Sequence, residues 1–198
     1  MAQILVVGKW EDYRLKGIDL AAKAIGHAVR QVGVDVSEIE LLIRGVPAGD
    51  GTKVRAEVHK WSGQPLLSVI LREHTPHEET LQRDLRRASL VLMPSRAEGF
   101  GLVGAEAITA GTPLLASEES GLGQLLRSAL PRDQAQRVVV PVTRDDTTDS
   151  EVWGHHIASV LRNRAAAFAD AFDVHNRLAG EYCWPSASAA FLDVVLGK

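Results

Sequence analysis

The sequence predicts an α/β domain built on one doubly wound parallel sheet of about six strands, with helices on both faces. Short apolar runs alternate with longer stretches of helical character, as expected when each strand is followed by a covering helix. Two of the runs, residues 4–8 and 90–94, are almost wholly apolar, which is typical of strands buried on both faces. A glycine-containing turn after the second run leads into a helix of small residues, a connection common in such folds.

The expected elements follow this alternation along the chain. The apolar runs predict strands at residues 4–8, 39–44, 66–71, 90–94, 112–116 and 137–142. Helices are expected at residues 17–32, 52–61, 77–87, 102–110, 122–129, 152–172 and 184–196, and the polar stretch 143–150 is interpreted as a loop. The arrangement is Rossmann-like, and its ligands are expected at the carboxyl ends of the strands. Residues 1–198 are predicted to form a single domain, which includes C-terminal helices from about residues 151–198.

Composition narrows the class of protein. A chain of 198 residues with 45% hydrophobic and 24% charged residues is expected to bury a substantial core. A net charge of -3 argues against binding to nucleic acid. The first apolar run has no charged leader and is too short for a signal peptide, and no stretch approaches the length that spans a membrane. With Cys183 as its single cysteine, the chain is expected in the reducing cytoplasm.

The most informative segment runs from Pro94 to Glu106. It places a glycine-containing turn at the start of a helix, where unpaired N–H groups and the helix dipole favour an anion. Two carboxylates, Glu98 before the helix and Glu106 within it, bracket the turn and could reach opposite parts of one ligand. The alternative is that the glycines serve packing alone and that a carboxylate only caps the helix.

The run Ser-Arg-x-Glu-Gly-Phe-Gly-Leu-x-x-x-Glu-Ala-x-x-x-Gly-x-Pro resembles the donor-binding signature of family 4 glycosyltransferases, which have the two-domain GT-B architecture. The resemblance implies that Glu98 and the turn amides of Phe100 and Gly101 hold the donor sugar, and that Glu106 holds the ribose of the nucleotide. It adds to the ligand-binding set three neighbours in the same turn and helix, namely Gly99, Leu102 and Val103.

A second phosphate-binding element is expected from Gly8-Lys9 at the end of the first strand and Lys16 at the start of the first helix. Both lysines could compensate a diphosphate in the same crevice as Glu98. In the family the position of Lys9 is usually arginine. Lysine keeps the positive charge there but lacks the guanidinium that can donate two hydrogen bonds to one phosphate. The alternative is that both lysines are solvated surface charges. Arg72, at the end of the third strand, is added to the ligand-binding set because its loop is placed to meet the base.

The resemblance implies a nucleotide-diphosphate-sugar donor domain of a retaining, metal-independent glycosyltransferase, with Lys9, Lys16 and Glu98 as catalytic residues and with no cofactor. The first strand begins so near Met1 that no acceptor-binding half is expected before it, so transfer would need a second domain or a partner chain. Whether the chain is an enzyme stays open. The alternative is a non-catalytic module that senses a nucleotide sugar or nucleoside diphosphate in a multidomain signalling or immune-type protein, and a third possibility is a purely structural domain.

Overall fold

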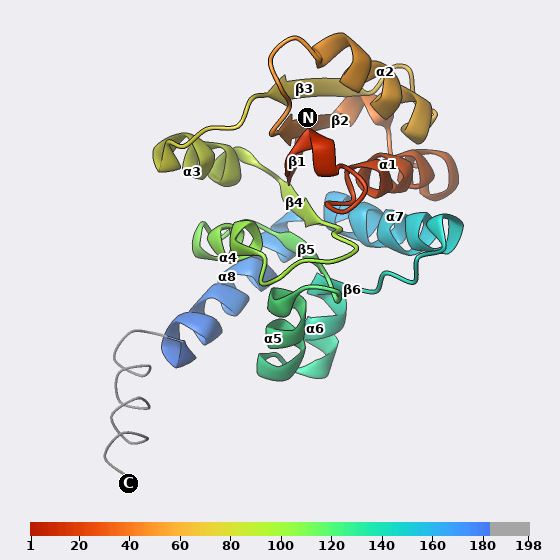
Figure 1. The fold of residues 1–198 in the computed structure, drawn as a ribbon. Helices are drawn as coiled ribbons and strands as arrows, with labels where there is room; N and C mark the ends of the chain where they lie inside the picture. The colour runs from red at the N-terminus through yellow and green to blue at the C-terminus, as the bar shows by residue number, and fades with distance from the viewer. Residues whose placement is uncertain (183–198) are drawn as a thin grey trace, which may run out of the picture.

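A single parallel sheet organises the computed structural model, which describes residues 1–182 (Figure 1). Its six strands lie in the order β3-β2-β1-β4-β5-β6, and each neighbouring pair runs parallel. The strands are β1 (Ala2–Val7), β2 (Ile39–Arg44), β3 (Ser68–Arg72), β4 (Leu90–Met93), β5 (Leu114–Ser117) and β6 (Val139–Val140). The doubly wound α/β class expected from the alternation of apolar runs is therefore confirmed.

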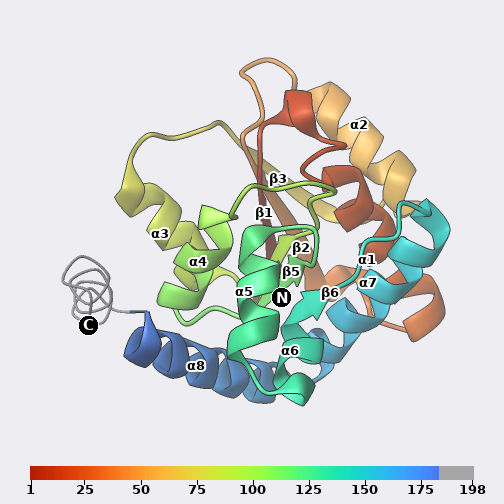
Figure 2. The ribbon, with the colours of Figure 1, turned by 60° about the horizontal axis from the view of Figure 1, so that its bottom comes forward.

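Eight α-helices lie in the described part of the chain. They are α1 (Ile18–Val32), α2 (Gly51–Ser62), α3 (Glu78–Arg87), α4 (Leu102–Thr109), α5 (Gly121–Ala129), α6 (Arg132–Val138), α7 (Asp146–Arg162) and α8 (Arg164–Glu181), with short 3-10 turns at Trp10–Asp12 (η1) and Val36–Glu38 (η2). Helices α1, α2 and α7 cover one face of the sheet, and α3, α4, α5, α6 and α8 cover the other (Figure 2). None of the described helices is long and apolar enough to cross a bilayer.

The central strand β1 shows why the apolar runs lack an alternating pattern. Ile4 packs into the cluster beneath α1, α2 and α7, whereas its neighbour Leu5 packs into the cluster on the opposite face, and both are fully buried. Successive side chains of a strand point to opposite faces, so a strand covered on both sides must be apolar throughout. Each such side chain contributes about 1.5–3 kcal/mol through burial.

Three expectations about the C-terminal third are wrong. The strand expected at residues 137–142 is only Val139–Val140, because the preceding residues form α6, which begins directly after Pro131. The loop expected at 143–150 is already helical from Asp146, since the Asp145 side chain accepts a hydrogen bond from the N–H of Thr148 and caps α7.

The helix expected at 152–172 is two helices. Asn163 leaves the helical conformation at φ -135° and caps α8 by accepting a hydrogen bond from the N–H of Ala166. The helix expected at 184–196 lies outside the described residues. Elsewhere the expected elements are present, with bounds that shift by one or two residues.

Candidate functional site

The chain reverses its winding direction between β1 and β4. From β1 it proceeds through β2 and β3 on one side and then returns to place β4 on the other side of β1. The connections after β1 and β4 therefore diverge, and the carboxyl ends of these two strands open a crevice between them. A cavity of about 540 Å³ occupies this place, within the size range of small-molecule sites.

Most of the sequence-predicted site residues line this one cavity. Those that do are Gly8, Lys9, Lys16, Glu98, Phe100, Gly101, Leu102 and Val103. They come from the end of β1, the approach to α1, and the loop and helix that follow β4. Segments more than 80 residues apart in the chain thus meet at the point where the strand order reverses.

Lys16 and Glu98 form an ion pair in the wall of the crevice. The Lys16 Nζ lies 2.6 Å from Glu98 Oε2, and the two side chains retain 28% and 20% of their exposure. Because both groups remain partly solvated, the pair costs little to rearrange. A ligand that brings its own negative charge and its own hydroxyl groups could engage each partner separately.

Gly17 explains how Lys16 reaches the loop after β4. Its φ of 68° lies in the left-handed region, and a Cβ built on it would lie 2.0 Å from the carbonyl oxygen of Pro94. Only glycine lets the start of α1 lie against the end of β4 in this way. The Lys-Gly pair and the Pro-Ser-Arg segment of the sequence are therefore in direct contact.

The start of α4 faces the same cavity. Gly101 caps the helix at φ 102°, and Leu102 and Val103 are its first residues and line the cavity. The N–H groups of a helix's first turn have no partner within the helix and attract an anion. The loop before α4 is held by main-chain hydrogen bonds from Glu98 N–H to Glu119, from Gly121 N–H to Gly99, and from Leu122 N–H to Phe100.

Three of the predicted residues do not line the cavity. Arg72 forms an ion pair with Asp84, whose carboxylate also accepts a 2.7 Å hydrogen bond from Arg44 Nε. Gly99 lies in the loop between Glu98 and Phe100 and is paired through its carbonyl. Glu106 is half-buried on α4, and burial, together with the negative charge of Glu78 on α3, raises the pKa of its carboxyl.

Sequence reasoning missed several residues of the wall, among them Asp12, Arg44, His74 and Ser95. Arg44 could have been noticed as a charged residue at the end of an apolar strand, but its side chain is 6% exposed and bonded to Asp84. Ser95 is 1% exposed and lies two residues beyond the end of β4, within the motif. Trp10, which follows Lys9, packs away in the core against Tyr13 and Trp61.

Potential metal ligands and a second cavity remain to be compared with the crevice. No group of three or more potential metal-ligating side chains is found within residues 1–182. A second cavity, of about 530 Å³, lies between α6, α7 and α8. Arg137 lines this cavity, but its guanidinium is already paired with Asp133 and Asp170. Most of the surface of the cavity wall is apolar. The crevice at β1 and β4 therefore has the better chemistry for an anionic, polyhydroxylated ligand.

Comparisons with known proteins show which family the chain resembles. The model of the family described as "Family 4 Glycosyltransferase in conflict systems" matches residues 1–191. The D-inositol 3-phosphate glycosyltransferase of Streptomyces coelicolor is 31% identical over 192 residues, which cover 91% of this chain and 37% of that protein. Glycogen synthase of Mycobacterium tuberculosis is 33% identical over 129 residues, covering 62% of this chain and 27% of that enzyme.

Solved structures share the fold. Sucrose-phosphate synthase from Thermosynechococcus elongatus superposes with a TM-score of 0.71 at 21% identity, covering 100% of this chain and 46% of that one. The catalytic domain of cholesterol-α-glucosyltransferase from Helicobacter pylori gives 0.65 at 16% identity, covering 88% and 95%. The chain spans little more than a third, 37%, of the length of its curated relative from Streptomyces coelicolor.

Proposed function

The chain belongs to the family 4 glycosyltransferases of conflict systems, and from that premise we propose that its crevice binds a nucleoside diphosphate sugar as a glycosyl donor. The observation that carries the proposal is the Lys16–Glu98 pair beside the start of α4, all on one cavity at the reversal of the sheet. A cation and a helix start suit a diphosphate, and a carboxylate suits sugar hydroxyl groups.

The ion pair supplies a mechanism for binding. A diphosphate entering the crevice would take over Lys16 as its counter-ion, joined by Lys9 and by the first N–H groups of α4. Glu98 would then lose its partner and accept hydrogen bonds from hydroxyl groups of the sugar. Hydrogen bonds to an ionised acceptor are the stronger kind, so the exchange replaces one ion pair by two charge-assisted contacts.

The nucleoside would extend from the diphosphate toward the outer part of the crevice. Glu106 does not line the cavity itself but lies one helical turn along α4 from Leu102, which does. We propose that Glu106 holds the ribose hydroxyl groups there, as the resemblance implies, and that the loop after Arg72 meets the base. His74, on that loop, lines the cavity and would face the base as well. Arg72 would serve by holding its loop through Asp84 more than by touching the ligand.

Transfer of the sugar needs an acceptor held in line with the donor. Because the chain spans only 37% of the length of its Streptomyces coelicolor relative, we propose that a second domain or a partner chain supplies the acceptor-binding side. In the completed protein Lys9 and Lys16 would stabilise the negative charge that develops on the departing diphosphate. Such a reaction would need no metal or other cofactor. We also propose a cytoplasmic location, on the argument from the single cysteine.

A non-catalytic sensing role is the second candidate. The observation that favours it is that the chain spans only 37% of the length of its Streptomyces coelicolor relative. The crevice of this chain alone could bind a nucleotide sugar without transferring the sugar. The two candidates agree on binding and differ on turnover, so donor hydrolysis or transfer in the presence of the completing domain would separate them.

Calorimetry and thermal-shift assays with UDP, GDP, ADP and their glucose conjugates test the proposal. One nucleotide should raise the Tm of the parent chain, and Lys16→Ala should weaken its affinity by about 1.5–3 kcal/mol, the value of a charged hydrogen bond. Lys60→Ala is the matched control, because Lys60 is a surface lysine on α2 paired with Glu57 and is not among the cavity-lining residues. Failure of all these nucleotides to bind would contradict donor binding.

A further inference from the structure

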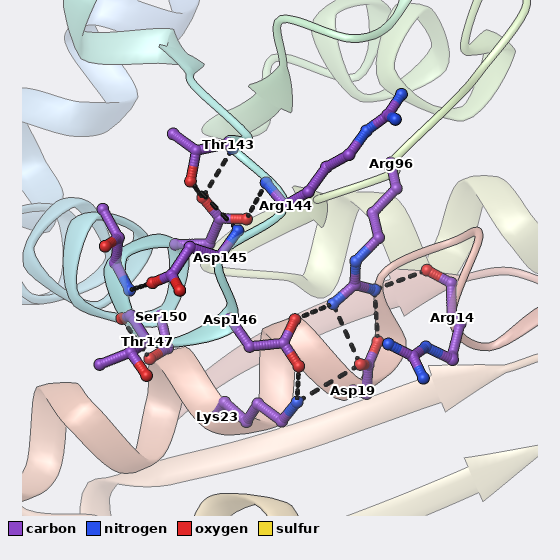
Figure 3. A network of polar contacts seen from close by, with 12 residues as sticks. Arg14, Asp19, Lys23, Arg96, Thr143, Arg144, Asp145, Asp146, Thr147 and Ser150 are labelled. Carbon is purple, nitrogen blue, oxygen red and sulfur yellow. Dashed lines mark hydrogen bonds and ion pairs between the residues drawn. The ribbon is translucent and has the colours of Figure 1, made fainter.

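Arg96 lies two residues before Glu98 in the sequence, and its side chain reaches Asp19 on α1 and Asp146 on α7 (Figure 3). Its guanidinium donates hydrogen bonds to both carboxylate oxygens of Asp19, at 2.8 and 3.1 Å, and to Asp146 Oδ1 at 2.8 Å. Arg96 is not among the residues that line the crevice. Its conformation therefore serves contacts between elements, and we ask what those contacts hold in place.

Lys23 completes the group, and we call Arg96, Asp19, Asp146 and Lys23 the clamp. The Lys23 Nζ lies 2.6 Å from Asp146 Oδ2 and 3.6 Å from Asp19 Oδ2, so two cations face two carboxylates. Asp19 is only 4% exposed, where charge-assisted hydrogen bonds are strong and an unpaired charge is costly. Hydrogen bonds from Lys23 and Arg96 hold the pKa of Asp146 below its usual value, so its carboxylate is ionised at neutral pH.

The clamp contacts the chain on both sides of Lys16. Arg96 Nη1 donates to the carbonyl of Arg14 at 2.6 Å, and the Arg96 backbone N–H donates to the carbonyl of Leu15 at 2.9 Å. Asp19 follows Lys16 by three residues on α1. Since Glu98 lies on the same short loop as Arg96, the clamp fixes the two backbones that carry the Lys16–Glu98 pair.

Helix α7 takes part through its first residue. Asp146 lies 50 residues beyond Arg96 in the sequence and is not among the residues lining the crevice. The connection before it is fixed by buried Asp149, which accepts hydrogen bonds from the N–H and hydroxyl of Thr143 and from the N–H of Arg144. Asp146 is thus presented to Arg96 from a well-bonded turn (Figure 3).

We propose that Arg96 is a positioning residue for the crevice and that Asp19 and Asp146 act through it. The clamp holds the backbones of Lys16 and Glu98 on facing sides of the crevice, where the lysine would meet the diphosphate and the carboxylate would meet the sugar. The inference depends on the proposed function only for the identity of the ligand. A purely structural contact would change overall stability, whereas a positioning contact also changes the loop of Glu98 and the affinity for ligand.

Amide hydrogen exchange in the absence of ligand is the first readout. In Arg96→Ala and in the milder Asp146→Asn, exchange at residues 95–101 should be faster by about tenfold, and Arg96→Lys should restore part of the protection. Arg137→Ala is the matched control, since Arg137 also bonds two carboxylates, Asp133 and Asp170, but is not among the residues that line the crevice. It should leave exchange at residues 95–101 unchanged.

The second readout is the calorimetric affinity for UDP-glucose, which in the proposed mode brings its diphosphate to Lys16 and its sugar to Glu98. It should fall by about tenfold in Arg96→Ala and Asp146→Asn, as expected from a displaced binding group, and should be unchanged in Arg137→Ala even where the Tm falls equally. Unchanged loop exchange in folded Arg96→Ala overturns the proposal, and so does faster exchange with undiminished affinity for the nucleotide sugar. If the parent chain binds no UDP-glucose, the comparison is made with GDP-glucose and ADP-glucose; if it binds none of them, the proposed ligand is wrong, and the exchange comparison still decides whether Arg96 holds the loop.

Discussion

Gly17 is the residue through which the first helix reaches the motif after β4. Its left-handed conformation and the 2.0 Å separation between a hypothetical Cβ and the Pro94 carbonyl oxygen leave no space for a side chain. The sequence shows only that a glycine follows Lys16. The reason that it must be glycine lies in the close approach of two segments distant in the chain.

Gly17→Ala should therefore lower the free energy of unfolding by about 3 kcal/mol, combining the cost of the left-handed conformation with that of an overpacked contact. Gly33→Ala is the control: its φ of 74° is similar, but no heavy atom lies within 4 Å of the added Cβ. The control should lose only the conformational part, about 1 kcal/mol. Urea denaturation measures both, and equal losses would exclude contact with Pro94 as a cause.

The ionised carboxylate of Glu106 destabilises the folded state, and its proposed role in binding the ribose would explain why a glutamate stands there. Burial raises the pKa of its carboxyl, and the charge of Glu78 adds to the effect. A carboxyl whose folded-state pKa is raised favours folding most when it is protonated, and this contribution is lost as pH rises through the folded-state pKa. At neutral pH the ionised Glu106 is thus kept at the expense of stability.

Glu106→Gln should consequently raise the Tm at pH 7, and the gain should disappear on acidification below the ordinary pKa of glutamate, about 4.3. Nucleotide affinity should fall in the same variant by about 1.5–3 kcal/mol, because the amide lacks the charge that strengthens hydrogen bonds to the ribose. Glu79→Gln, at an exposed position on α3, should change neither quantity. A lower Tm for Glu106→Gln at pH 7 would contradict the inference that ionised Glu106 destabilises the folded state.

At the scale of elements, the contact between α1 and α7 holds an unusual histidine pair. The rings of His27 and His155 lie 5.1 Å apart, and His27 Nε2 is buried without a hydrogen-bond partner among the described residues. Burial lowers the pKa of His27, as do the charges of His155 and Arg30, while Glu151 acts in the opposite direction. The folded state therefore favours the neutral ring.

A histidine whose pKa is lower in the folded state than in the unfolded state stabilises the fold through its neutral ring. This contribution is fully present above the ordinary histidine pKa of about 6.5 and is lost as the pH falls below that value. The Tm of the parent should fall between pH 7.5 and 5.5, and His27→Leu should reduce that fall. Thermal unfolding at both pH values measures the difference. His77→Gln, at an exposed position, should retain the full dependence, and an undiminished fall in His27→Leu would remove this histidine as its cause.

The elements that sequence reasoning misplaced share a local explanation. The run from Asp145 to Ser150 looks like a polar loop, but an aspartate cap followed by acidic residues in the first turn is also how α7 begins. The break between α7 and α8 rests on Asn163, whose capping side chain is a weak signal inside a continuous helical pattern. Short polar segments support either interpretation, and the packing of α7 against α1 and of α8 against α4 decides between them.

At the scale of the whole molecule, two apolar clusters on opposite faces of one sheet leave the carboxyl edge of β1 and β4 free for binding. The clusters hold β1 and β4 in register, while the connections that carry Lys16 and Glu98 take their positions from those strands. The chain spans 37% of the length of its Streptomyces coelicolor relative, and the second domain or partner chain that we propose would complete this open crevice.

Local patterns in the chain were sufficient to predict the fold class and most of the sheet, because burial on both faces and turn chemistry are written in neighbouring residues. Together with the family resemblance they named eight residues that line the crevice, but they missed Asp12, Arg44, His74 and Ser95 in its wall. They were not sufficient for contacts between distant segments. A common crevice for Lys16 and Glu98 was expected, but not their direct ion pair across 82 residues. Nor did local patterns show that Arg72 pairs with Asp84 or that Asp146 reaches Arg96 from a helix that they placed in a loop. Such pairings depend on strand order, register and close approach of backbones, which arise when the helices pack on the sheet.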